Sequence, residues 1–149
     1  MGRLRDLDGR RVYLDSNVFI YALNGFPGFA PFLRELFEAV DSCRVSAATS
    51  ELTLAEVLIV PFRHGDVDEE KRCRMMLRPR PCLSLIPVSF NVLEATARMR
   101  AALPAMRTPD AIHVATAQLA NCDILLTNDH RLKGCEGLHV SFLSDIVQA

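Results

Sequence analysis

The feature that most constrains the fold is a short apolar run that stops at an acid and is followed at once by a helical pattern. Val12–Leu14 is rich in strand formers and ends at Asp15, and apolar residues then return at the three- and four-residue spacing of a helix face. This predicts a buried strand and then a helix with Ser16 or Asn17 as its N-cap. Because ligands bind at the carboxyl ends of strands in open α/β sheets, Asp15 is either a turn-forming acid or a site residue.

The rest of the chain repeats this alternation of strands and helices. Further strands are predicted at Val45–Ala48, Leu83–Val88, Ile124–Leu126 and Val140–Leu143. Helices are predicted at Phe32–Val40, Thr49–Pro61, Asp68–Arg80, Val92–Leu103 and Thr108–Ala120, with Pro61 helping to end the second of these. The alternation predicts an α/β fold in three layers, α/β/α, with a central parallel sheet flanked by helices.

Length and composition indicate an ordinary globular protein. At 149 residues we expect a single domain over 1–149, with residues 1–10 as a loose lead-in. A formal net charge of −1 gives no overall attraction to nucleic acid, although fifteen of the seventeen basic residues are arginines, whose planar fork suits phosphate. No apolar run reaches the ~18 residues of a membrane span, and the charged N-terminus is unlike a signal peptide.

The cysteines show no pattern of a disulfide or zinc framework. They are odd in number and include no C-x-x-C pair. This predicts reduced thiols in a cytoplasmic protein. The five residues are Cys43, Cys73, Cys82, Cys122 and Cys135.

Three more acids lie in otherwise apolar stretches, and each has a structural explanation of its own. Glu56 fits a capping box with Thr53, although the apolar pattern of that helix begins a few residues earlier. Asp110 fits the first turn of a helix capped by Thr108, where an acid favours the helix dipole. Asp129 fits an ordinary polar turn.

The joint pattern of the four acids is more informative than any one of them. Asp15 and Asp129 follow strands that end alike, and Asp110 opens the helix before the second of these strands, so all three belong to one edge of a parallel sheet. Glu56 faces the same crevice if its apolar neighbours face the sheet. Four carboxylates there would repel one another unless a cation lay between them. Because no His or Cys accompanies these acids, Mg²⁺ or Mn²⁺ is favoured over zinc.

Four stretches around these acids share their motifs with a known family. They are Leu14–Asn17, Ala55–Leu58, Thr108–Ala117 and Leu126–Asp129. In these stretches the chain resembles the PIN-domain ribonucleases, and specifically the VapC-like toxins of toxin–antitoxin pairs. The resemblance spans roughly residues 12–143 in the right order, and its most specific part is P-D-A-I-H-x-A-T-A followed by T-N-D.

The resemblance implies a metal-dependent endoribonuclease that cuts RNA, is restrained by an antitoxin encoded beside it, and forms a homodimer. The metal-binding and catalytic acids implied are Asp15, Glu56, Asp110 and Asp129, with Asn17 and Thr127 as supporting polar residues. A bound Mg²⁺ or Mn²⁺ would lower the pKa of water and neutralise charge on the scissile phosphate. Candidate walls for an antitoxin groove are the helices at Phe29–Val40 and Leu52–Ile59.

Basic and histidine side chains are less informative. A basic segment is a candidate for binding RNA phosphates beside the acidic crevice, and the alternative is a solvated helix face. Its arginines are Arg72, Arg74, Arg78 and Arg80. We expect His113 to pack or bond at the helix–sheet junction rather than act as a general base, and His130 to lie on the surface.

Other functions fit part of the pattern. Receiver-like or phosphatase-like folds also place aspartates at strand ends, but they need a lysine near the end of a central strand, and neither Lys71 nor Lys133 fits. A PIN-fold nuclease outside toxin–antitoxin systems and a catalytically silent PIN-fold interaction module remain alternatives. Binding of Mg²⁺ or Mn²⁺ distinguishes the silent module from a nuclease.

Overall fold

The structure is a computed structural model that describes residues 2–135 and 137–148. In this part of the chain, five parallel strands form one sheet in the order β3-β2-β1-β4-β5. The strands are β1 (Arg11–Leu14), β2 (Ser46–Ser50), β3 (Leu83–Ile86), β4 (Ile124–Thr127) and β5 (His139–Phe142). The predicted α/β class with a central parallel sheet is confirmed.

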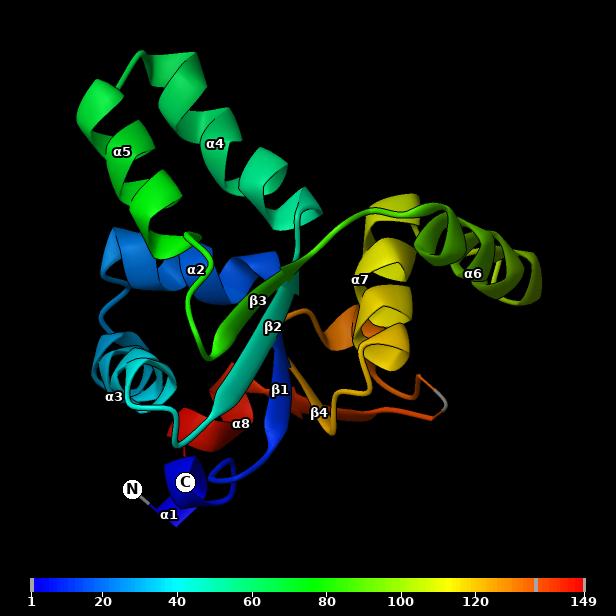
Figure 1. Cartoon of the computed structure of the whole chain (residues 1–149), viewed down its shortest axis with the longest axis horizontal. Helices are drawn as coiled ribbons and strands as arrows, with labels where there is room; N and C mark the ends of the chain where they lie inside the picture. The colour runs from blue at the N-terminus through cyan, green and yellow to red at the C-terminus, as the bar shows by residue number, and fades with distance from the viewer. Residues whose placement is uncertain (1, 136, 149) are drawn as a thin grey trace.

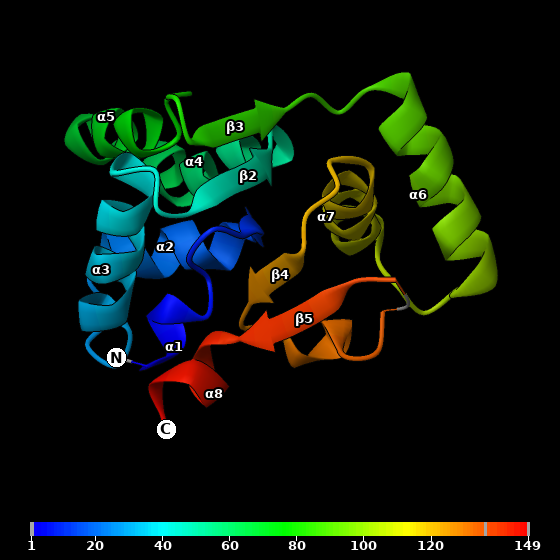
Figure 2. The ribbon, with the colours of Figure 1, turned by 60° about the horizontal axis from the view of Figure 1, so that its bottom comes forward.

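Helices cover both faces of this sheet (Figures 1 and 2). They are α1 (Gly2–Arg5), α2 (Ser16–Asn24), α3 (Ala30–Asp41), α4 (Leu52–His64), α5 (Val67–Met76), α6 (Phe90–Ala102), α7 (Thr108–Leu119), α8 (Leu143–Val147) and the short 3-10 helix η1 (His130–Leu132). The pair α4 and α5 projects beyond the sheet (Figure 1), while α6 and α7 lie on the side away from α2 and α3. Within the described ranges, no helix is both long and apolar enough to cross a membrane.

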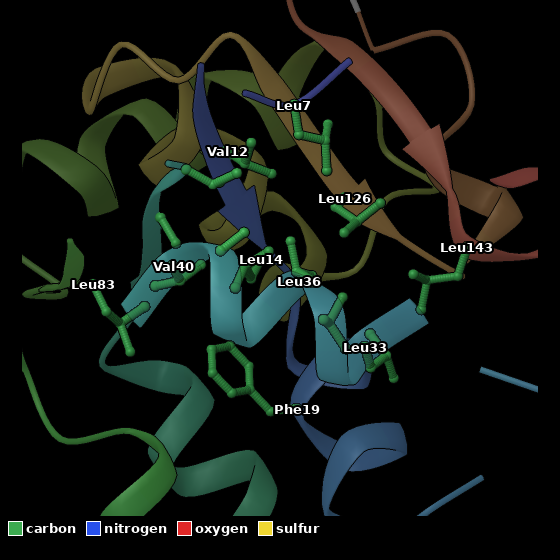
Figure 3. Packing of buried hydrophobic residues seen from close by; sticks show 14 of the residues in the cluster. Leu7, Val12, Leu14, Phe19, Leu33, Leu36, Val40, Leu83, Leu126 and Leu143 are labelled. Atoms are coloured by element: carbon green, nitrogen blue, oxygen red, sulfur yellow. The ribbon is translucent and has the colours of Figure 1, made fainter. Parts of the chain in front are cut away.

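Consecutive residues of β1 point into two different cores. Val12 and Leu14 join a large apolar cluster with Phe19 of α2 and Leu36 of α3 (Figure 3). Tyr13 points to the opposite face, into a smaller cluster with residues of α7. This is the two-residue period of a strand that is covered on both faces. The predicted three-layer arrangement is therefore confirmed.

The carboxyl ends of the two central strands lie side by side. Leu14 pairs with Leu126 in the register of β1 and β4, and the amide of Asp15 donates to the carbonyl of Leu126 at 3.0 Å. The turns that follow the two strands are thereby brought together, although they are more than a hundred residues apart in the chain.

Helix α2 is capped by the acid that ends the strand. Oδ1 of Asp15 accepts a hydrogen bond from the amide of Ser16 at 2.7 Å. The prediction of Ser16 or Asn17 as the N-cap is therefore wrong, because an aspartate in extended conformation caps equally well and lies one residue earlier.

The predicted caps of α4 and α7 are also absent. Helix α4 begins at Leu52 without a side-chain cap, so Thr53 and Glu56 do not form a capping box. Helix α7 already includes Thr108, and its N-cap is Arg107, which makes no capping hydrogen bond through its side chain. Glu56 and the first turn of α7 are therefore left for other contacts.

Pro61 lies inside α4 and does not end it. The helix continues to His64 and stops at Gly65, whose φ of 62° is in the left-handed region. Proline removes the N–H that would bond to the carbonyl of Val57. That carbonyl instead accepts from the thiol of Cys73 on α5 at 3.6 Å, so the neighbouring helix satisfies it.

The first ten residues are packed against the core, and the expectation of a loose lead-in is wrong for the described part of this segment. Leu4 of α1 and Leu7 are only 7% and 3% exposed and belong to the large apolar cluster. The amide of Gly9 also donates to the carbonyl of Arg44 at 2.8 Å. Two leucines three residues apart give this short segment an apolar face. The many charged residues around them made the segment look entirely polar in the sequence.

Cys43 and Cys82 form a disulfide, so the prediction that all the thiols are reduced is wrong for this pair. Their Cα atoms lie 5.5 Å apart, within the range of natural disulfides. The amide of Ala47 in β2 donates to the carbonyl of Cys82 at 2.8 Å, which aligns the N-terminal ends of β2 and β3. Cysteines 39 residues apart in sequence become neighbours only once β2 and β3 pair. The free cysteines of the described chain are Cys73, Cys122 and Cys135.

Candidate active site

Asp15 is the most buried acid of the site and its hydrogen bonds are all satisfied by nearby donors. The residue is 6% exposed. Besides the amide of Ser16, it is contacted at Oδ2 by the hydroxyl of Thr127 at 2.7 Å and by Nδ2 of Asn17 at 3.2 Å. Asp15 is therefore held in one orientation at the end of β1.

The polar residues expected to support the site link the ends of β1 and β4. Nδ2 of Asn17 donates to Thr127 Oγ1 at 3.1 Å, and Asn17 Oδ1 accepts from the amide of Asn128 at 3.2 Å. Thr127 Oγ1 also accepts from the amide of Asp129 at 3.0 Å. Both predicted supporting residues thus contact Asp15, and one of them fixes the backbone that carries Asp129.

Glu56 is joined to the site through His113. Nε2 of His113 lies 2.5 Å from Glu56 Oε1 and 3.6 Å from Asp15 Oδ1. Nδ1 of the same ring lies 2.6 Å from the hydroxyl of Tyr13, which also accepts from the amide of Ser50 at 3.1 Å. The ring is 2% exposed. His113 therefore bonds at the junction of helix and sheet, as expected, and it also bridges two acids.

The acids set the charge of the buried ring. Burial alone would lower the pKa of His113, but the hydrogen bond to Glu56 and the charges of Asp15, Glu56 and Asp110 outweigh it, so the pKa is raised. Burial, followed by the charge of Asp15, raises the pKa of Tyr13 well above its ordinary value, so the phenol stays neutral. Tyr13 is therefore a neutral hydrogen-bonding partner of a ring whose protonated form the neighbouring acids stabilise.

Asp110 and Asp129 are each paired with an arginine. Arg107 reaches Asp110 through Nε at 2.9 Å and Nη2 at 3.3 Å. Arg131 reaches Asp129 through Nε at 2.8 Å and Nη2 at 2.5 Å, and its hydrogen bonds lower the pKa of Asp129. Both contacts use two nitrogens on two oxygens, the strongest geometry for such a pair.

The four acids lie close enough to act on the same neighbours. The charges of Asp15, Glu56 and Asp110 all raise the pKa of His113. The pKa of Arg131 is raised mainly by its hydrogen bond to Asp129, and also by the charges of Asp110 and Asp15. The four acids therefore lie within electrostatic reach of these two side chains, and their convergence on one metal ion stays a prediction.

The donor set fits a hard divalent cation in its chemistry, because carboxylate oxygens are the ligands that Mg²⁺ and Mn²⁺ prefer. The arrangement in the described part of the chain is more open: no group of three or more His, Cys, Asp or Glu is gathered as a metal cage there. Asp110 and Asp129 turn their oxygens to Arg107 and Arg131. The two arginines thus supply positive charge that offsets the repulsion expected among the four carboxylates.

The basic segment proposed for RNA lies at the other end of α2 from the acids. Arg72 donates to the carbonyl of Leu23, near the C-terminus of α2, whereas Asp15 precedes its first residue. A helix of this length spans about 13 Å. Arg72 also pairs with Glu69, and the other ion pairs are Arg74–Glu70 and Arg80–Asp41. Arg78 lines a hollow with Arg72 and Arg80 at this end.

Three residues were not recognised from the sequence as partners of the site's acids and histidine. Tyr13 gives no local signal, because an aromatic residue within a strand reads as core. Arg107 precedes Asp110 by three residues and Arg131 follows Asp129 by two, so a search for charges beside each acid would have found both. His130 is exposed, as expected, and stacks on Phe142.

Comparison with known proteins identifies the family. The sequence matches the PIN domain over residues 12–137. No curated protein sequence matches the chain. Solved structures do: a chain of a toxin–antitoxin complex from Klebsiella pneumoniae is 26% identical with a TM-score of 0.65, and the match covers 89% of this chain and 97% of that one.

Two further structures show the same fold at lower identity. A chain of VapBC2 from Rickettsia felis, bound to a DNA fragment from the promoter, is 19% identical with a TM-score of 0.70, covering 89% of this chain and 98% of that one. VapC20 from Mycobacterium tuberculosis, a toxin that cleaves the sarcin-ricin loop, is 13% identical with a TM-score of 0.60, covering 76% and 86%. The family match spans most of the chain, which therefore belongs to the PIN domain family.

Proposed function

We propose that this protein is a divalent-metal-dependent endoribonuclease and the toxin of a toxin–antitoxin pair. The observation that carries the proposal is the position of Asp15 and Glu56, which both lie beside the same nitrogen, Nε2, of one buried imidazole at the carboxyl edge of the sheet. Membership of the PIN domain family supports the nuclease class. The similarity to chains of toxin–antitoxin complexes supports the toxin assignment.

In this proposal Asp15, Glu56, Asp110 and Asp129 hold Mg²⁺ or Mn²⁺. When bound, the ion lowers the pKa of water and neutralises charge on the scissile phosphate of the RNA. The other groups act on the acids themselves. Thr127 and Asn17 fix both the rotamer of Asp15 and the turn after β4, and His113 fixes Glu56. Ligand orientation by such neighbours commonly changes metal affinity 10- to 100-fold.

An antitoxin segment has a suitable groove on the side of α2 and α3. A hollow of about 370 Å³ is lined there by apolar and charged side chains, including Phe37, Arg34 and Met76. Leu58, which belongs to the helix predicted from the sequence as a groove wall, is buried instead, whereas Met75 at the end of α5 is 73% exposed. An amphipathic helix fits a groove of this chemistry. We place the groove at α2, α3 and the end of α5.

The proposed homodimer would use the helices near the site. Exposed apolar side chains project from α4 at Ile59 and Phe62, and from α6 at Phe90 and Leu93. Phe90 is 80% exposed, which is unusual for an aromatic residue without a partner. A cytoplasmic location, where such an RNA substrate would be found, is part of this proposal.

A metal-free interaction module is the second candidate, and one observation favours it. Asp110 and Asp129 already have cationic partners in Arg107 and Arg131. Titration with Mn²⁺ distinguishes the two functions, because the module would bind no ion while keeping the fold.

The central test is cleavage of a mixed RNA pool by wild type and by Asp15→Asn, each with Mg²⁺ or Mn²⁺ and with EDTA. We expect metal-dependent cleavage that the substitution abolishes. The substituted side chain keeps the shape of Asp15 and stays within reach of Ser16 and Thr127, so folding of the variant can be verified by melting. Equal cutting by the variant or in EDTA would indicate another nuclease and remove the proposal.

The toxin assignment is tested in cells. We expect expression of the chain alone to arrest growth, and Glu56→Gln or co-expression of the neighbouring small reading frame to relieve the arrest. Harmless expression of a protein that cleaves RNA in vitro would remove the toxin assignment and leave the nuclease assignment standing.

A further inference from the structure

Two cations of the chain itself lie against acids that we propose as metal ligands. Arg107 and Arg131 each approach both oxygens of their partner, Asp110 and Asp129, at 2.5 to 3.3 Å. Both carboxylates are therefore neutralised without an added ion. Because each arginine lies within three residues of its acid in the chain, the pairs form with little further ordering of the chain.

Exposure shows which member of each pair is able to move. The side chains of Asp110 and Asp129 are 15% and 18% exposed, whereas those of Arg107 and Arg131 are 58% and 60% exposed. The acids thus lie inside the crevice and the guanidinium groups cover them from the solvent. Because the guanidinium groups lie in solvent, water and salt screen these two-pronged contacts, and the arginine is the partner that is free to leave.

The other two acids have partners of a different kind. Asp15 is held by an amide and the hydroxyl of Thr127, and Glu56 by the buried ring of His113. These donors are part of the core and stay where they are. The crevice therefore contains two acids with fixed partners and two acids with removable cations.

We propose that Arg107 and Arg131 are built-in counter-cations that compete with the divalent ion for Asp110 and Asp129. The inference rests on the proposed function, since it concerns the metal of the same site. Each arginine must leave its carboxylate before that carboxylate binds metal. In the metal-free protein the same contacts relieve the repulsion among the four acids.

The released side chains have room beside the site. Arg107 and Arg131 both line a pocket of about 400 Å³, which Asp110 also lines and which extends to Lys133 and to apolar residues such as Met106. The guanidinium groups can withdraw into this space without disturbing the core. Metal loading then requires only rotation of two exposed side chains.

The test is calorimetric titration of Mn²⁺ into the wild type, Arg107→Gln, Arg131→Gln and the double variant. We expect about threefold tighter binding for each arginine removed, the scale of an exposed ion pair. Arg98→Gln is the matched control, because Arg98 forms an exposed ion pair with Glu94 on α6 at 2.9 Å and contacts no site acid. Its Mn²⁺ affinity should equal that of the wild type.

Two more measurements separate a direct contact from a general effect of charge. Arg131→Lys keeps the charge but loses the two-pronged contact, so its affinity should lie between those of wild type and Arg131→Gln. An affinity equal to that of the wild type would overturn competition by contact. In EDTA, the double variant should melt below the wild type, and Mn²⁺ should raise its melting temperature by more.

The titrations distinguish failure of the counter-cation role from failure of the proposed nuclease function. If the wild type binds Mn²⁺ and the arginine variants bind it equally or more weakly, the counter-cation role is wrong and the nuclease proposal stands. If neither the wild type nor any variant binds Mn²⁺, the metal-dependent function fails and the counter-cation role fails with it.

Discussion

The imidazole of His113 is held against Glu56, with Nε2 only 2.5 Å from Oε1. Glu56 belongs to α4 and His113 to α7, which lie on opposite faces of the sheet. The ring is anchored on its other side by the hydroxyl of Tyr13 at 2.6 Å. Helices from the two outer layers thus meet at the site through one buried side chain, and we infer that His113 determines where Glu56 points.

Replacing the ring tests this positioning role. His113→Gln should lower RNA cleavage about tenfold, the scale for loss of a residue that orients a metal ligand. It should also cost about 1–3 kcal/mol of stability, because the hydroxyl of Tyr13 loses a buried partner. Initial cleavage rates over a range of Mn²⁺ concentrations measure the first effect, and urea unfolding measures the second.

Tyr13→Phe is the matched control for that substitution. It removes the hydroxyl at the far side of the ring but leaves the contact between His113 and Glu56. We expect a loss of stability with most of the cleavage retained. Full activity in His113→Gln would contradict the positioning role.

The raised pKa of His113 predicts how the stability of the metal-free protein depends on pH. Burial opposes the cation, but the hydrogen bond to Glu56 and the charges of Asp15 and Asp110 outweigh it and raise the pKa above 6.5. The folded state then binds the proton more tightly than the unfolded state does. The contribution to stability is fully present below pH 6.5 and is lost as the pH rises through the folded pKa.

Melting in EDTA from pH 6 to about pH 9 checks this sign, because the range lies on both sides of an ordinary histidine pKa. As the pH rises above 6.5, the melting temperature of the wild type should fall more steeply than that of His113→Gln. Parallel curves for the two proteins would show that the ring does not gain a proton on folding.

The sequence predicted the order of strands and helices because buried strands and amphipathic helices carry their own periodicity. It located Asp15 and Asp129 at strand ends for the same reason, since an apolar run that stops at an acid is a local signal. The pairing of Arg107 with Asp110 could also have been predicted, because the arginine lies only three positions before the acid.

Contacts between distant parts of the chain could not be predicted from the sequence. Tyr13 and His113 are a hundred residues apart, and only the pairing of sheet and helix brings them together. Cys43 and Cys82 likewise become neighbours through the pairing of two strands. The burial of Leu4 was not predicted for a related reason. The core residues that a short apolar face packs against are known only from the folded structure.

The disulfide predicts a stability that depends on redox conditions. A bridge between residues 39 apart restricts the unfolded chain, which is worth about 2–4 kcal/mol for a loop of this size. Dithiothreitol should therefore lower the urea midpoint of the oxidised wild type toward that of Cys43→Ser. The variant itself should not respond to the reductant. An identical midpoint for wild type with and without reductant would show that the two thiols do not pair.

We expect removal of the Thr127 hydroxyl to weaken metal binding more than it lowers the stability of the fold. It donates to Asp15 at 2.7 Å and accepts from the amide of Asp129 at 3.0 Å, so it touches two of the proposed metal ligands. Thr127→Val keeps the shape of the side chain but removes both contacts. We expect about 10-fold weaker Mn²⁺ binding by calorimetry and a loss of about 1–2 kcal/mol in stability.

Thr116→Val is the matched control for this last prediction. Thr116 is as fully buried as Thr127, but its hydroxyl donates at 2.6 Å to the carbonyl of Ile112 within α7 and contacts no acid. Its replacement should leave Mn²⁺ affinity unchanged whatever its effect on melting. If the two variants weakened Mn²⁺ binding equally, the effect would come from general loosening of the fold. A loss confined to Thr127→Val would instead locate it at the hydrogen bonds between β1 and β4, which hold Asp15 and Asp129 in register.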